Sequence, residues 1–104
     1  MGRAEPSGID TMADLRGQID AIDGELLSLL AERQRHVDRA VVLKQAEGIG
    51  AAAPGRVAEV LAKVRGRALD SGLDPAIAGA IWQVMIEGFI AREERILGKD
   101  GTDR

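Results

Sequence analysis

The sequence predicts an all-α protein whose three helices run in the order long, short, medium. Apolar residues recur at the three- and four-residue spacing of amphipathic helices, and no segment alternates as a strand would. Glycine and proline cluster in the interior at 48–55 and 72–75, which places the helix breaks there. We expect one helical domain over residues 12–98, with flexible tails at 1–11 and 99–104.

The first helix is predicted to begin near Thr11 or Met12 and to end at about Glu47, before Gly48. A helix of about 36 residues would be about 54 Å long, whereas a compact monomer of this size has a diameter of roughly 35 Å. Its apolar stripe continues along the whole length, so an intertwined homodimer is expected to cover the overhang. The stripe consists of Leu15, Ile19, Ile22, Leu26, Leu29, Leu30, Val37 and Ala40.

The second helix is predicted from about Gly55 to Ser71, with Gly72 as its left-handed C-terminal residue. Asp74 is expected to cap the third helix, which starts at Pro75 and continues to about Leu97. The predicted inner face of the second helix is Val57, Val60, Leu61, Val64 and Ala68. The predicted apolar face of the third helix is Trp82, Ile86, Phe89, Ile90 and Leu97.

Two cations interrupt the apolar stripe of the first helix. Arg33 and Lys44 fall near its middle and, three turns apart, project the same way. A buried unpaired charge costs several kcal/mol, and the stripe itself supplies no carboxylate. The pattern therefore predicts a small anionic ligand held inside a helical bundle.

Three further charged residues belong to this prediction. Glu93 falls in the centre of the apolar face of the third helix. It is expected to pair with Arg33 or Lys44, to act as a neutral hydrogen-bond donor beside them, or to reach water at the helix end. Arg16 lies at the edge of the stripe, where it can cross a dimer interface. Arg56 opens the second helix, and helix N-termini favour anions.

Composition argues against several other functions. The net charge is −3 and Trp82 and Phe89 are the only aromatic residues, so no nucleic-acid partner is expected. With no cysteine and a single histidine, His36, neither a metal site nor a Ser-His-Asp triad is expected. No apolar run approaches the roughly 20 residues of a membrane span, and the N-terminus lacks a hydrophobic signal core. We therefore expect a cytoplasmic protein without a membrane partner.

Several motifs together resemble the all-helical class of chorismate mutases over about residues 14–97. They are LRGQIDAIDGELLSLLAERQRHV, then Lys44, then PGRVAEVL, SGLDP and IWQVMIEGFIAREE. The resemblance implies an isomerase of aromatic amino acid biosynthesis in the shikimate pathway, which converts the dianion chorismate to prephenate without a cofactor. It also implies a three-helix protomer in an intertwined homodimer.

The same resemblance implies a role for each candidate residue. Arg16 would be donated by the partner chain, and Arg33 would bind a substrate carboxylate. Lys44 would hydrogen-bond the ether oxygen and a carboxylate, and Glu93 would face that oxygen as a neutral acid. Arg56 would complete the binding set. Activity is then expected to fall as the pH rises, and Glu93→Gln is expected to flatten the fall.

The ring-substituent end of the pocket departs from the usual pattern. Many mutases of this class carry acidic residues where this chain has Ala53 and Val57, and Phe89 replaces a small polar residue found in some members. Isochorismate-pyruvate lyases and 4-amino-4-deoxychorismate mutases share the fold and the Arg/Lys set. Both activities therefore remain alternatives, as does a helical dimerisation or regulatory module without activity.

Overall fold

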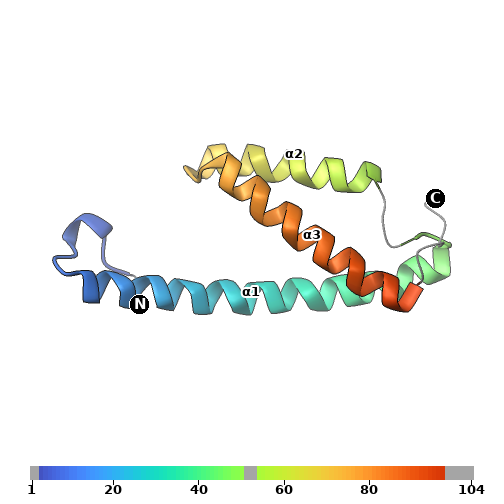
Figure 1. Ribbon diagram of the computed structural model, residues 1–104, viewed down its shortest axis with the longest axis horizontal. Helices are drawn as coiled ribbons and strands as arrows, with labels where there is room; N and C mark the ends of the chain where they lie inside the picture. The colour runs from blue at the N-terminus through green and yellow to red at the C-terminus, as the bar shows by residue number, and fades with distance from the viewer. Residues whose placement is uncertain (1–2, 51–53, 98–104) are drawn as a thin grey trace. The chain divides into compact units, whose positions relative to one another are not determined.

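The computed structural model describes residues 3–50 and 54–97, and these contain helices and no strand (Figure 1). A short 3₁₀ helix, η1 (Pro6–Gly8), precedes α1 (Met12–Glu47), α2 (Pro54–Ser71) and α3 (Pro75–Leu97). The predicted all-α class and its long, short, medium order are confirmed. Ala53, Gly98 and the predicted tail at 99–104 lie outside the described residues. Within the described ranges, no helix is both long enough and apolar enough to cross a membrane.

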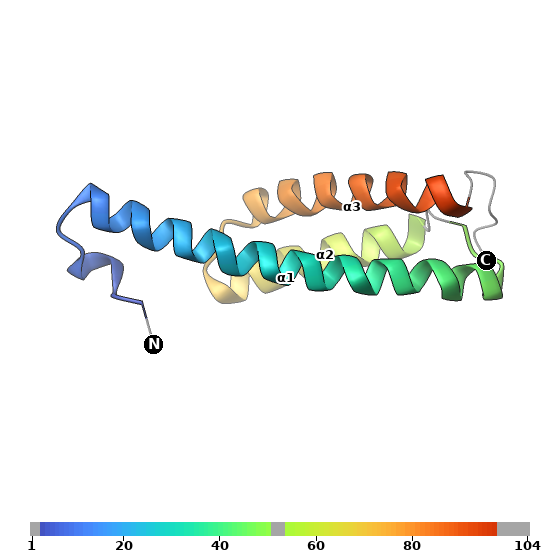
Figure 2. The same ribbon diagram turned by 90° about the horizontal axis from the view of Figure 1, so that it is seen from below.

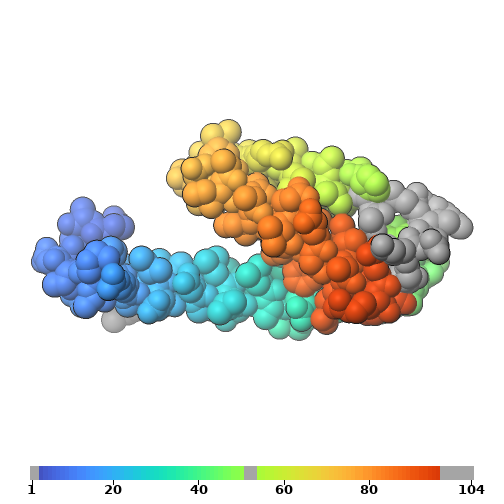
Figure 3. Space-filling view, in the orientation of Figure 1, coloured from blue at the N-terminus to red at the C-terminus, as the bar shows by residue number. Residues whose placement is uncertain are grey.

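The chain divides into two compact units, Met1–Arg35 and His36–Arg104. In the first unit the side-chain oxygen of Thr11 accepts a hydrogen bond of 3.1 Å from the backbone N–H of Asp14, which caps the start of α1. The Gln18 side chain exchanges two hydrogen bonds, of 2.7 and 3.1 Å, with the backbone of Ala4. These bonds tie the segment that carries η1 to the beginning of α1. The atoms of both segments are blue in Figure 3 and form one cluster at the end of the chain.

The apolar stripe of the first unit is largely open to solvent. Leu26 is 51% exposed and Leu29 is 62% exposed, and neighbouring members of the stripe are exposed as well. A continuous apolar surface of this kind is typical of an interface with another chain.

In the second unit, α2 and α3 form a helical hairpin (Figure 2). Gly72 has a φ of 79°, and the backbone N–H of Leu73 donates a 2.9 Å hydrogen bond to the carbonyl of Ala68. This geometry closes α2 with a left-handed residue, which glycine adopts without steric cost. The side chain of Asp74 then accepts a 2.9 Å hydrogen bond from the N–H of Ala76 and caps α3. The predicted turn between these helices is confirmed.

The second unit is packed around the faces predicted for α2 and α3. All five residues of the α2 face are buried or half-buried. Of the predicted α3 face, Ile86 is buried and Trp82, Phe89 and Ile90 are half-buried, whereas the side chain of Leu97 lies outside the described residues. Among the buried hydrophobic side chains, Ala78 on α3 and Val41 on α1 were not predicted. α1 ends at Glu47 and is followed by Gly48, whose φ of 71° again suits glycine.

Candidate active site

A buried ion pair joins α1 to α3 in the second unit. The Lys44 ammonium lies 2.6 Å from Oε2 of Glu93, and the two side chains are 21% and 7% exposed. Of the three arrangements open for Glu93, the structure has the ion pair with Lys44, and the carboxylate does not reach water. Removing two charges from water is costly, so their mutual attraction has to offset a substantial desolvation penalty.

Helical spacing explains why both charges lie inside. Lys44 follows Val37, Ala40 and Val41 by seven, four and three residues, so it shares their face of α1. Glu93 stands in the same relation to Ile86, Phe89 and Ile90 on α3. Each charge therefore occupies the position at which an amphipathic helix would carry another apolar residue.

A second ion pair connects the same two helices at a more exposed place. Arg92 donates hydrogen bonds of 2.9 and 3.0 Å from Nε and Nη2 to the two carboxylate oxygens of Asp38. These hydrogen bonds, together with the positive charge of Arg92, hold the pKa of Asp38 below its ordinary value, and the pKa of Arg92 is raised in return. The forked pair thus joins α3 to α1 through the residue that directly precedes Glu93 in the sequence.

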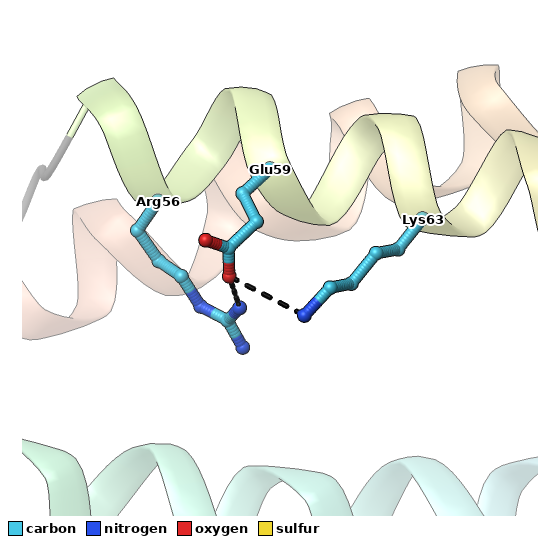
Figure 4. Close-up of polar contacts among 3 residues, drawn as sticks. All are labelled: Arg56, Glu59 and Lys63. Carbon is cyan, nitrogen blue, oxygen red and sulfur yellow. Dashed lines mark hydrogen bonds and ion pairs between the residues drawn. The ribbon is translucent and has the colours of Figure 1, made fainter.

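Arg56 lies exposed in the first turn of α2, where its guanidinium contacts the carboxylate of Glu59 (Figure 4). The Lys63 ammonium lies 3.5 Å from the same carboxylate oxygen. The hydrogen bond from Arg56 and the charge of Lys63 lower the pKa of Glu59. Val57, the next residue after Arg56, is half-buried on the inner face of α2.

The two remaining candidates belong to the first unit. Arg33 is half-buried, with its Nη1 atom shielded from solvent, and Arg16 is exposed. Among the described residues, no group of three or more histidine or acidic side chains could hold a metal ion.

The sequence did not reveal every contact around these residues. Asp38 and Arg92 are 54 positions apart and neither interrupts an apolar pattern, so no local signal marks their pairing. Glu59 and Lys63 could have been found, because they follow Arg56 at spacings of three and then four residues, at which side chains meet on a helix.

The fold and these charged side chains together define a class of protein. An all-helical chain that buries a lysine beside a carboxylate and presents further arginines is suited to binding a small polyanion. It offers a positive donor where water is scarce, and electrostatic stabilisation is strongest in such places.

Comparison with known proteins identifies the family. The model of the family "Chorismate mutase type II" matches residues 15–94. The chain is 29% identical over 89 residues to a chorismate mutase of Methanocaldococcus jannaschii. The aligned residues cover 86% of this chain and 90% of that protein. No solved structure matches the chain. The chain belongs to the chorismate mutase type II family, which confirms the resemblance seen in the sequence, and it is therefore an enzyme of the isomerase class.

Proposed function

We propose that this enzyme isomerises chorismate to prephenate at a site built around Lys44 and Glu93. The observation that carries the proposal is the buried 2.6 Å contact between these two residues, which lie on different helices and are 49 positions apart in the sequence. The sequence resemblance assigns the same two positions to the ether oxygen of the substrate. A buried lysine at a position that the resemblance assigns to the ether oxygen would supply the positive donor that the reaction needs, and this supports the proposal.

The reaction explains the choice of residues. The rearrangement is unimolecular and needs no nucleophile, so catalysis consists of holding a compact conformer and stabilising negative charge on the breaking C–O bond. Lys44 would donate to that oxygen and to a substrate carboxylate. Its low exposure strengthens the interaction, because little water competes for the ammonium.

Glu93 would have two states in this mechanism. In the free enzyme it is the counter-charge of Lys44. When the dianion arrives, a second carboxylate beside the ether oxygen would be repulsive, so Glu93 would take up a proton and donate a hydrogen bond to that oxygen. Activity would then fall as the pH rises, and Glu93→Gln, which always donates, would flatten the fall.

The arginines would hold the carboxylates of the substrate. Guanidinium groups match carboxylates by two parallel hydrogen bonds, and this favours Arg33 and Arg56 for the task. Val57 would line the end of the pocket near the ring substituent, where its apolar side chain makes no hydrogen bond. The apolar side chain of Val57 at this position keeps isochorismate-pyruvate lyase as a second candidate function, because valine cannot hydrogen-bond a ring hydroxyl.

A homodimer would complete the site. The stripe of the first unit remains exposed, with Leu29 at 62%, and a second copy of the chain is the partner whose own stripe matches it. Arg16 is exposed on the same helical segment and would reach the site of the partner chain.

The direct test is to incubate the purified enzyme with chorismate, isochorismate and 4-amino-4-deoxychorismate in separate reactions. Prephenate from chorismate would support the proposal, whereas salicylate plus pyruvate from isochorismate alone would identify a lyase. Lys44→Met should lower the rate of prephenate formation by about 10²–10³-fold, because one donor to the developing charge is lost. Arg95→Met removes an exposed cation from α3 and serves as the matched control, with a rate close to that of the wild type.

A further inference from the structure

The carboxylate of Glu59 lies between two cations on one side of α2 (Figure 4). It contacts the guanidinium of Arg56, and Lys63 approaches the same oxygen at 3.5 Å. We propose that Glu59 competes with the substrate for Arg56, and that a substrate carboxylate displaces it toward Lys63. The inference rests on the proposed function, in which Arg56 binds a carboxylate of chorismate.

Helix geometry allows this exchange without movement of the backbone. Glu59 is three residues after Arg56 and four residues before Lys63, so its side chain can meet either cation. A glutamate four residues before a lysine is also the more favourable order of that pair. When the Glu59 carboxylate leaves Arg56, it can therefore still pair with Lys63.

Exposure makes the exchange easy. The side chains of Arg56 and Glu59 are 62% and 53% exposed, and water screens such pairs strongly. A ligand with two carboxylates can therefore replace the internal one. Until it does, the fraction of Arg56 paired with Glu59 is unavailable, and the apparent affinity for the substrate falls by that fraction.

Opposite shifts in KM follow for two substitutions. Glu59→Gln should lower KM for chorismate by about two- to five-fold, the range expected for an exposed pair, because Arg56 is no longer occupied. Lys63→Gln should raise KM, since Glu59 then keeps Arg56 as its remaining cation on this face. The kcat should hardly change in either variant, because the exchange is complete once the substrate is bound. Glu59 is thus a positioning residue and not a catalytic one.

The experiment is a double-substitution cycle that uses the wild type, E59Q, K63Q and E59Q/K63Q. KM and kcat for chorismate are measured at one ionic strength, and circular dichroism checks the helical content of each variant. If Lys63 acts through Glu59, K63Q has no effect once Glu59 is replaced, so the double variant matches E59Q. A K63Q effect of equal size in both backgrounds would mean that charge alone is at work, and it would overturn the exchange.

The outcome also separates this inference from the proposed function. A wild-type enzyme that turns over chorismate while E59Q shows an unchanged or raised KM refutes the exchange alone. A wild-type enzyme without turnover refutes the proposed function and the exchange with it. A carboxyl NMR titration of Glu59 gives a second readout, because its lowered pKa should move toward the ordinary value when chorismate takes Arg56 away from it.

Discussion

The buried pair of Lys44 and Glu93 allows stability and activity to be separated in one experiment. Lys44→Met and Glu93→Met each leave one charge without its partner, whereas the double substitution replaces both charges by apolar side chains of similar length. We expect the single variants to be destabilised and the double variant to regain the stability of the wild type. The double variant should nevertheless be inactive, because the donor to the ether oxygen is gone.

The magnitude follows from the burial of each partner. Removing one member of a buried ion pair typically costs about 3–5 kcal/mol. Lys44→Met should lie in this range, because the carboxylate of Glu93 is only 7% exposed and cannot reach water. Glu93→Met should cost less, about 1–3 kcal/mol, since Lys44 is 21% exposed and its flexible stem can carry the ammonium outward. The double variant should lie within about 1 kcal/mol of the wild type or above it.

Urea unfolding at one fixed protein concentration measures these differences, because the stability of an oligomer depends on concentration. With a slope of about 2 kcal/mol/M, a loss of 4 kcal/mol lowers the midpoint by about 2 M. The exposed pair of Asp38 and Arg92 bridges the same helices and provides the matched control cycle, in which Asp38→Asn and Arg92→Met should shift the midpoint far less.

The reasoning would be refuted if the two single effects were small and simply added in the double variant. Additive effects would mean that Lys44 and Glu93 are not energetically coupled, whatever their distance. A double variant that retained mutase activity would instead refute the catalytic assignment while leaving the coupling intact.

Three further predictions concern other parts of the chain. Arg33→Ala should lower kcat by about 10²–10³-fold in a chorismate assay, with unchanged circular dichroism. Arg35 is an exposed neighbour, and Arg35→Ala should match the wild type. Equal turnover of both variants would show that Arg33 does not belong to the site. The pKa of Asp38 in the folded state lies below its ordinary value of 3.8, so its carboxylate stabilises the fold above pH 3.8 and this contribution is lost as the pH falls further. Asp38→Asn should therefore flatten the acid side of a stability profile measured by urea unfolding. An unchanged acid slope would contradict this. Leu29→Glu places a charge in the exposed stripe and should give a monomer in analytical ultracentrifugation. Ser28 precedes Leu29 and is not a member of the stripe, so Ser28→Glu should leave the oligomer intact. A wild-type protein that is a monomer would count against the proposed assembly.

The helix boundaries could be predicted because local chemistry sets them. Thr11 caps α1, and Gly48 and Gly72 end α1 and α2 with the positive φ that glycine tolerates. The burial of Val41 was not predicted, because the predicted stripe contains Val37 and Ala40 but not Val41. In the second unit, Val41 shares the inner face of α1 with Val37, Ala40 and Lys44. The hydrogen bonds between Ala4 and Gln18 require the chain to reverse its direction before α1, and the spacing of apolar residues in the sequence does not predict such a reversal.

Of the two ion pairs that join α1 to α3, the sequence marks only the one whose charges interrupt an apolar pattern. Lys44 and Glu93 stand out in this way on their separate helices, but their contact requires the fold that brings α1 to α3. Asp38 and Arg92 occupy positions that suit any polar residue, so their pairing has no signature in the sequence. Sequence patterning thus finds the members of a buried pair more readily than the partners of an exposed one.

Stability alone does not explain why a lysine and a glutamate lie between α1 and α3, because apolar residues of similar volume would hold the helices together at least as well. The proposed site for a dianion would have to keep its lysine charged before the ligand arrives, and the buried contact with Glu93 would supply that counter-charge. Chorismate, once bound, would take over this task with its own carboxylates, so the pair is better explained by ligand binding than by stability.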